Sequence, residues 1–249
     1  MSGHSKWHSI KHKKALVDAK RGSVFTRLIR EITVAAKIGG GDPSMNPRLR
    51  TAVAAGKAAN MPAKNIENAI KKGTGDLPGV VYEEIAYEGY GPGGVAVLVQ
   101  TTTDNKNRTS AEVRHAFTKY GGNLGEVGCV TWMFFKKGQL LVDGKDVDED
   151  ELMMVALDAG AEDVVNNGDN FSIVTGPNEL VDVQDKITET GFTVQSSEVA
   201  MIPENFVKVE GKEAASLMKL LGILEDLDDT QLVSANFDID DELLEQLHS

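Results

Sequence analysis

The spacing of apolar residues changes once along the chain, near Gly75, and this change restricts the folds that the chain can adopt. Before Gly75 the apolar residues recur at the three- and four-residue spacing of amphipathic helices. After it, short alternating segments typical of strands are interleaved with further helical segments. We therefore expect an α+β protein in which an N-terminal helical bundle is followed by two α/β domains.

The bundle is predicted from three helical segments within residues 1–75. Apolar residues from Val24 to Ala36 form one stripe, which ends at Gly39-Gly40-Gly41. Asn46-Pro47 is typical of an N-cap followed by proline at the first helical position. Asn60-Met61-Pro62 breaks that helix and starts another, which we expect to stop at Gly73.

The second predicted domain is split, because residues 80–137 and 204–240 supply parts of one α/β pattern. Thr109-Ser110-Ala111-Glu112 is a capping box, so a helix should begin there and run to Tyr120. If the two parts form one sheet, the strands Val130–Phe135 and Leu232–Phe237 must both lie in it. The expected elements are strands Glu83–Glu88, Val95–Thr101 and Val130–Phe135, a helix Lys212–Leu224 and a strand Leu232–Phe237.

The third predicted domain, residues 138–203, lies between these two parts and has a complete pattern of its own. Its order is βαββαβ, the ferredoxin-like plan. We therefore expect it to be inserted into the second domain. The expected elements are Leu140–Val142, a helix Asp148–Asp158, a hairpin of Asp163–Asn166 and Phe171–Val174, a helix Leu180–Thr190 and a strand Val194–Met201.

The charge of the chain is divided unevenly between these regions. Residues 1–75 hold fifteen basic and four acidic side chains, a net charge of +11, whereas residues 76–249 hold eleven basic and thirty-four acidic ones, a net charge of −23. Residues 1–21 have few apolar side chains and predict a mobile arm or a poorly buried helix. Such asymmetry is typical of a nucleic-acid-binding domain, so we expect the bundle and its arm to bind nucleic acid.

The residues expected to contact nucleic acid are the basic side chains of this region, together with two asparagines that could pair with adenine in a major groove. Trp7 and Phe25 are the only aromatic residues there, which favours structured RNA or duplex over single strands held by base stacking. The candidate residues are Lys6, Lys11, Lys13, Lys14, Lys20, Arg21, Arg27, Arg30, Arg48, Arg50, Lys64, Asn65, Asn68, Lys71 and Lys72.

Other patterns in the sequence do not predict catalysis or a bound cofactor. Gly89-x-Gly91-x-x-Gly94 has the dinucleotide spacing, but a strand follows it and we expect a hairpin loop. Asp146, Asp148 and Asp150 fit a helix N-terminus better than a calcium loop. Lysines surround His4, His8 and His12, which argues against a metal site. We therefore predict no enzyme, cofactor, metal or small-molecule substrate.

The cellular compartment is predicted from three features: the length of apolar runs, the N-terminal sequence and the cysteine content. No apolar run approaches the ~18 residues that span a bilayer, and no signal peptide opens the chain. The single cysteine, Cys129, can form no intramolecular disulfide, and its apolar neighbours predict a buried, inert thiol. We expect a cytoplasmic protein without a membrane partner.

Several segments together resemble the YebC family over essentially the whole chain. They are Gly3-His4-Ser5-Lys6-Trp7, Ile10-Lys11-His12-Lys13-Lys14, Asp18, Arg21-Gly22, Asn46-Pro47-Arg48-Leu49-Arg50, Asn60-Met61-Pro62, Tyr87-Glu88-Gly89-Tyr90-Gly91-Pro92-Gly93-Gly94, Asn105-Lys106-Asn107-Arg108-Thr109 and Trp132-Met133-Phe134. The resemblance implies three domains and places Lys6, Lys11, Lys13, Lys14 and Arg21 in a segment that contacts nucleic acid. Cys129 departs from the small hydroxyl residue expected there.

Three functions follow as hypotheses. The family has been labelled as probable DNA-binding transcriptional regulators, and it also includes mitochondrial translational activators and bacterial members linked to ribosomes stalled on proline runs. Our first hypothesis is a ribosome-associated translation factor that contacts rRNA or tRNA and relieves stalled elongation. The second is a transcriptional regulator that binds duplex DNA. The third, a metal-dependent enzyme acting on RNA, lacks a visible catalytic set.

Overall fold

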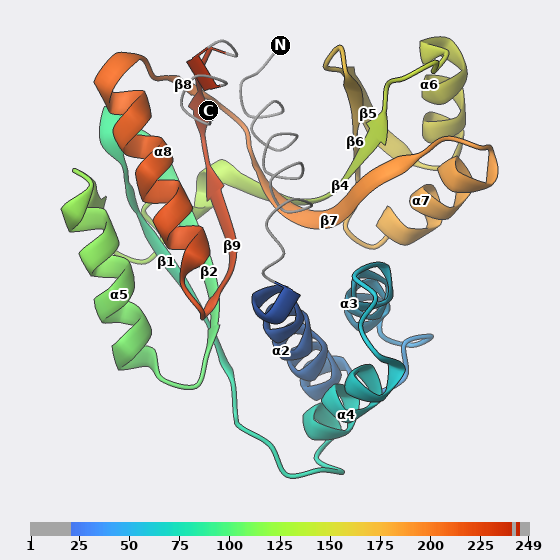
Figure 1. Cartoon of the computed structure of the whole chain (residues 1–249), viewed down its shortest axis with the longest axis horizontal. Helices are drawn as coiled ribbons and strands as arrows, with labels where there is room; N and C mark the ends of the chain where they lie inside the picture. Colours follow the sequence, from blue (N-terminus) through green and yellow to red (C-terminus); the bar gives the residue numbers. More distant parts are fainter. Residues whose placement is uncertain (1–20, 241–242, 245–249) are drawn as a thin grey trace.

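The computed structural model describes residues 21–240 and 243–244, with the side chains of residues 21–23 left out. Figure 1 shows three parts: a bundle of helices at the bottom, a sheet covered by helices on the left, and a second sheet with helices packed on it on the right. This confirms the predicted α+β class with an N-terminal helical bundle. Among the described residues, no helix is long and apolar enough to cross a membrane.

The bundle consists of α2 (Arg21–Gly39), α3 (Pro47–Ala58) and α4 (Ala63–Thr74). Asn46 fixes the turn between the first two helices, as its position before Pro47 predicted. Its Oδ1 accepts from the backbone N of Leu49 at 3.1 Å, and its Nδ2 donates to the carbonyl of Ala35 at 2.8 Å. Ile32, Leu49 and Ile66, one from each helix, lie in the shared core.

The predicted stop at Gly73 is wrong, because α4 continues to Thr74 and ends at Gly75, which adopts the left-handed conformation. Gly73 instead marks a close approach of α4 to α2. A Cβ at this position would lie 2.3 Å from the carbonyl oxygen of Thr33 and 2.8 Å from the Cβ of Ala36. The glycine is therefore needed for helix packing.

The first sheet has the strand order β3-β1-β2-β9. Its strands are β1 (Glu83–Tyr90), β2 (Ala96–Thr103), β3 (Asn123–Leu124) and β9 (Thr230–Ala235). The glycine-rich segment after β1 holds the short turn η1 (Pro92–Gly94) and connects β1 to its antiparallel partner β2, as the hairpin prediction required. A short parallel pair, β8 (Val207–Lys208) and β10 (Phe237–Asp238), lies beside this part.

Two helices, α5 (Lys106–Lys119) and α8 (Gly211–Asp226), pack on one face of this sheet (Figure 1). Val97 and Val99 of β2 contribute to their common core. The capping-box prediction is wrong here: α5 begins three residues before Thr109, with Asn105 as its N-cap. Thr109 is fully buried, and its hydroxyl is used in contacts to other segments.

The second sheet has the order β5-β6-β4-β7, with every neighbouring pair antiparallel. Helices α6 and α7 pack on it, around a core that includes Leu140, Ile173 and Ile187. This is the predicted βαββαβ plan. The elements are β4 (Phe134–Asp143), α6 (Glu149–Asp158), β5 (Ala161–Asn166), β6 (Asn170–Thr175), α7 (Leu180–Glu189) and β7 (Val194–Pro203).

The two sheets divide the chain differently from the prediction at one place. Val130–Phe135 was expected in the same sheet as Leu232–Phe237, and this prediction is wrong. Instead, residues 131–133 form a short turn, η2, and Phe134 begins β4 of the second sheet. The predicted boundary between the two domains, at Gly138, lies inside β4. A Cβ at this glycine would lie 2.2 Å from the Oγ1 of Thr175. The chain still returns to the first sheet, because β9 pairs with β2.

Candidate nucleic-acid interface

The exposed face of α4 brings together five of the predicted residues. Ile66 and Ala69 bury the opposite face of this helix in the bundle core. Positions three, four, seven and eight residues apart share one side of a helix, so the candidate residues form a continuous stripe along the outside. They are Lys64, Lys71 and Lys72, which are exposed, and Asn65 and Asn68, which are half-buried.

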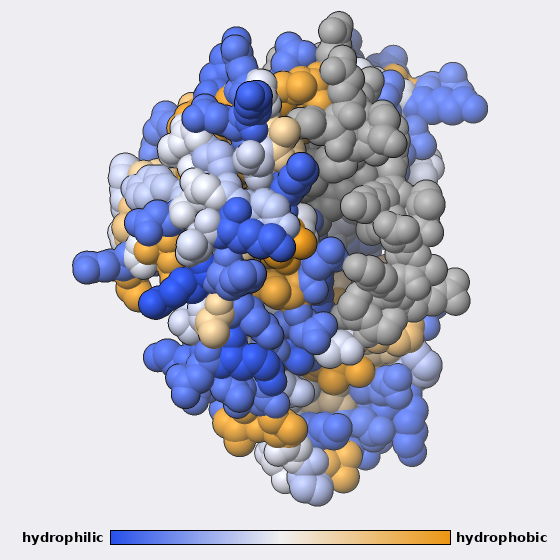
Figure 2. Space-filling view, turned by 60° about the vertical axis from the view of Figure 1, so that its left-hand side comes forward, coloured by the Kyte–Doolittle hydropathy of each residue, from blue (hydrophilic) through white to orange (hydrophobic). Residues whose placement is uncertain are grey.

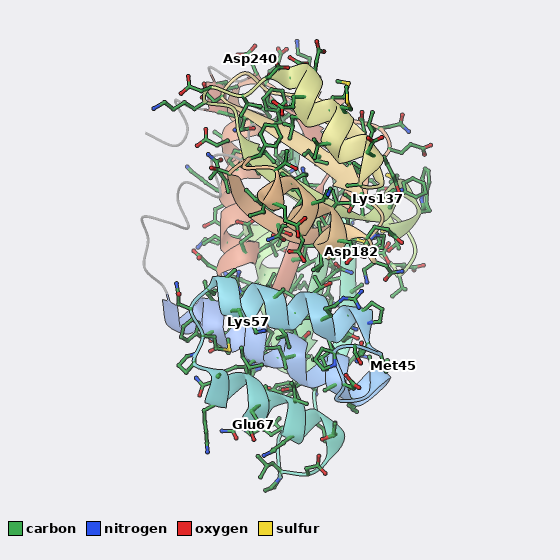
Figure 3. The ribbon with its side chains drawn as sticks, turned by 90° about the vertical axis from the view of Figure 1, so that its right-hand side faces the viewer. Met45, Lys57, Glu67, Lys137, Asp182 and Asp240 are labelled. Carbon is green, nitrogen blue, oxygen red and sulfur yellow. The ribbon has the colours of Figure 1, made fainter. Side chains whose placement is uncertain are left out.

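This stripe lies at one end of the molecule. Figure 3 shows α4, marked by Glu67, at the end away from the two sheets, with α3, marked by Lys57, between them. Glu67 forms an ion pair with Lys71 one turn away, and this contact raises the pKa of Lys71. The contact with Lys71 and, more weakly, the charge of Lys64 lower the pKa of Glu67. Lys37 and Lys57 add two further exposed cations to the bundle.

Arg27 and Arg30, which were predicted to contact nucleic acid, project from α2 toward the first sheet. Arg27 donates to the carbonyl of Glu225 in the last turn of α8, where unpaired carbonyls favour a cation. Arg30 donates to the carbonyls of Thr102 and Asp228 and lies 5.6 Å from the ring centre of Tyr82. Both guanidinium groups therefore have partners within the protein.

The centre of this junction is the carboxylate of Asp229, whose side chain is only 1% exposed. Its Oδ1 lies 3.0 Å from the Nη1 of Arg30. Its Oδ2 accepts from the Nη2 of Arg108 at 2.6 Å, from the hydroxyl of Thr109 at 2.7 Å and from the hydroxyl of Thr103 at 2.9 Å. One buried carboxylate thus joins the bundle to the start of α5 and the end of β2.

The charge of Asp229 is stabilised by these donors. Burial by itself raises the pKa of a carboxyl group, but the hydrogen bonds from Arg108, Thr109 and Thr103 and the charge of Arg30 outweigh it, and the pKa of Asp229 is lowered. The hydrogen bonds of Arg108 to Asp229 and to Asp104 raise the pKa of its guanidinium group. The junction is therefore fully ionised at neutral pH.

Arg48 makes a second link between the bundle and the first sheet. Its Nε and Nη2 donate to the carboxylate of Glu31 at 2.7 and 2.9 Å, and its Nη1 and Nη2 donate to Glu84 of β1 at 3.1 and 2.6 Å. Arg50 is half-buried, and its Nε is buried without a hydrogen-bond partner among the described residues.

The remaining predicted residues cannot be placed in this interface. Lys6, Lys11, Lys13, Lys14 and Lys20 lie outside the described residues, as do His4, His8 and His12. Arg21 begins α2, but its side chain is not described. The prediction of a buried thiol at Cys129 is wrong, because this residue is only half-buried.

Sequence reasoning missed the residues that orient the bundle, above all Asp229 and Arg108. Asp229 is one of four acidic residues in Glu225-Asp226-Leu227-Asp228-Asp229-Thr230, and nothing local distinguishes it from its exposed neighbours. Among the described residues, no group of three or more His, Cys, Asp or Glu side chains could hold a metal ion.

Comparison with known proteins agrees with this organisation. The family model for the TACO1/YebC protein N-terminal domain matches residues 5–76, and the model for the TACO1/YebC second and third domain matches residues 82–237. A crystal structure of a conserved hypothetical protein from Aquifex aeolicus is 50% identical to this chain, with a TM-score of 0.80 over 90% of this chain and 93% of that one.

The match to two relatives extends over the whole length of each. A protein of Geobacter sulfurreducens named a probable transcriptional regulatory protein is 60% identical over 247 residues, which is 99% of this chain and 100% of its own. A Dictyoglomus turgidum protein with the same name is 54% identical over 248 residues, again 99% of this chain and 100% of its own. The chain therefore belongs to the TACO1/YebC family.

Proposed function

We propose that this protein regulates gene expression by binding nucleic acid through its helical bundle. The observation that carries the proposal is the stripe of Lys64, Lys71 and Lys72 on the outer face of α4, in a region with a net charge of +11. Lysine side chains neutralise phosphates and release counterions whatever the base sequence. The bundle therefore supplies affinity, and the stripe faces the nucleic acid.

For the target, we propose the ribosome, where the protein acts as a translation factor that contacts rRNA or tRNA. The support is the opposite charge of the rest of the chain, −23 over residues 76–249. Duplex DNA is negatively charged along its whole length, so it repels this acidic part of the chain beyond the basic bundle. A ribosome presents both RNA and basic proteins, so both ends of this molecule find complementary charge there. Relief of elongation stalled on proline runs remains part of this proposal through the family resemblance.

A second candidate is a transcriptional regulator that binds duplex DNA. The names of the curated relatives support it, and so does the position of Asn65 and Asn68 among the lysines of α4. Asparagine can donate to and accept from adenine in the major groove while lysines hold the flanking phosphates.

The binding test replaces Lys64 and Lys72 with glutamine in the full chain and follows affinity against salt. Each lost phosphate contact should reduce the slope of log K against log salt by about one. The matched control replaces Lys212 and Lys219, two exposed lysines of α8, and should leave both affinity and slope unchanged. Equal losses in the two variants would refute the assignment of the interface to α4.

The target test follows where the native protein sediments. A translation factor should co-sediment with ribosomes at low salt and leave them after a high-salt wash, and cells that lack it should show ribosome pauses. Asn65→Ala with Asn68→Ala should then change ribosome binding little. Sedimentation with chromosomal DNA, unchanged pausing and a loss of sequence preference in the asparagine variant would establish the DNA-binding candidate instead.

A further inference from the structure

Exposed aromatic side chains gather where the chain passes from the first sheet to the second. Among the described residues, the exposed aromatics are Tyr90, Trp132, Phe135 and Phe206. Tyr90 ends β1, Trp132 lies in η2, and Phe135 is the second residue of β4. Phe206 follows β7, whose end pairs with the start of β4. Tyr90 and Trp132, which both contact the loop at Cys129, form together with Val127 what we call the Trp132 surface.

The rings of Tyr90 and Trp132 are fixed by one shared acceptor. The hydroxyl of Tyr90 and the Nε1 of Trp132 each donate to the carbonyl of Cys129 at 3.2 Å. Both polar groups are therefore satisfied inside the protein, while 64% of Trp132 stays in solvent. Tryptophan and tyrosine held in this way offer a large contact area with little conformational entropy to lose.

The loop that carries Cys129 is held from beneath by Glu88, which is only 3% exposed. Its carboxylate accepts from the backbone N of Gly128 at 2.7 Å and from those of Val130 and Thr131 at 2.8 Å. Burial alone raises the pKa of Glu88, but these backbone donors outweigh it and lower the pKa. A buried carboxylate thus stabilises a loop that leaves Val127 90% exposed.

The other exposed apolar side chains among the described residues are mostly aliphatic, such as Val81 and Met154. On the face shown in Figure 2 the surface is mostly hydrophilic, and apolar residues form small separate patches. Single exposed apolar residues need no explanation, but a group of aromatic ones marks an interaction site. The rigid loop and the grouped aromatics at the Trp132 surface therefore point to a partner.

The charge around this surface selects the class of partner. Glu126 precedes Val127 and is exposed, and exposed Glu204 lies beside η2, where its backbone N donates to the carbonyl of Met133 at 3.0 Å. Lys136 is the exposed cation nearest in sequence to Trp132. Residues 76–249 as a whole carry −23, so this part of the chain repels phosphate and attracts a positively charged surface.

We infer that the Trp132 surface is a docking site for a basic protein, whose apolar side chain packs between Trp132 and Val127 while its cations face Glu126 and Glu204. The inference rests on the proposed function, since a ribosome offers basic proteins beside the RNA that the bundle binds. Stacking of a nucleobase on Trp132 and packing against a second copy of this chain are the rival occupants, and the experiment below separates them.

The main experiment places a p-benzoylphenylalanine photocrosslinker at Val127 of the full chain and adds purified ribosomes. A matched control carries the crosslinker at Met154 of α6, which is 66% exposed. We expect Val127, and not Met154, to crosslink to a ribosomal protein. Trp132→Ala should lower that yield at least about tenfold, as for a central aromatic anchor, and Trp132→Phe should retain most of it. Crosslinks to RNA alone, to a second copy of the chain, or equally from both positions would overturn the inference.

A second measurement keeps the two proposals apart if the native chain does not sediment with ribosomes. Trp7 and Trp132 are the only tryptophans, so a Trp7→Phe chain reports on Trp132 alone. A synthetic peptide of alternating lysine and leucine should shift its fluorescence to shorter wavelength, and Glu126→Gln with Glu204→Gln should weaken that binding several-fold at low salt. No shift with the peptide, or quenching by single-stranded RNA only, would refute the docking site independently of the ribosome.

Discussion

Replacing Asp229 with alanine should loosen the helical bundle from the first sheet. The substitution removes the buried carboxylate that faces Arg30 and Arg108 across the junction and takes one acceptor away from the hydroxyl of Thr103. Removing one partner of a buried ion pair typically costs about 3–5 kcal/mol of unfolding free energy. Asp229→Asn keeps one carbonyl acceptor and should cost less.

The assay is equilibrium unfolding in urea, followed by circular dichroism. Asp228→Ala is the matched control, because Asp228 is exposed and contacts Arg30 only through its backbone carbonyl. A double-mutant cycle with Arg30→Ala should give a coupling free energy of about 0.5–3 kcal/mol. A loss below ~1 kcal/mol for Asp229→Ala, where buried pairs usually lose several, or a coupling of zero would show that the carboxylate does not join the two parts.

The same contact predicts a dependence on pH. Because the pKa of Asp229 is lowered in the folded protein, its stabilisation is fully present above the ordinary carboxyl pKa of about 4 and is lost as the pH falls through the folded value. The stability difference between the native chain and Asp229→Asn should therefore be constant near neutral pH and shrink below about pH 4. A difference that grows on acidification would contradict the lowered pKa.

Three further predictions concern local packing and the second link. Gly73→Ala should destabilise the bundle by about 1–3 kcal/mol, because the added Cβ meets a backbone carbonyl. Gly222→Ala in α8 is the control and should not destabilise the protein, because nothing lies within 4 Å of the added atom. Thermal unfolding of both variants checks this. Glu88→Gln should speed hydrogen exchange at the amides of residues 128, 130 and 131, and unchanged protection would argue against its role. Arg48→Ala should lower stability by less than about 1 kcal/mol in urea, because its ion pair with Glu84 is partly exposed.

The parts of the fold that the sequence predicted are those determined by neighbours along the chain. Asn46 before Pro47 formed the expected cap, and the acidic run at Asp148 formed another, with the side chain of Asp148 accepting from the backbone N of Glu151. The order of strands and helices in residues 138–203 was sufficient to predict a ferredoxin-like sheet, because short connections allow few alternatives.

The features that the sequence did not predict are those that distant residues decide. Thr109 has the sequence of a capping residue, but Asn105 caps α5 and the hydroxyl of Thr109 turns to Asp229, 120 residues away. Arg27 and Arg30 belong to the same basic region as the lysines of α4 and cannot be distinguished from them by charge. Yet they contact residues 198 positions later in the chain. Charge counting predicts that a region is basic, but it cannot tell which cations face solvent.

The pairing of β2 with β9 also sets an order of events during synthesis. A chain made from its N-terminus exposes Ala96–Thr103 long before its partner Thr230–Ala235 exists. The ferredoxin-like sheet, complete at residue 203, can close first, and domains generally fold as units during translation. The last anchor of the bundle comes later still, because the carboxylate that faces Arg30 is residue 229. A nascent chain halted before that residue would therefore carry its basic bundle attached only through earlier contacts, such as that of Arg48 with Glu84.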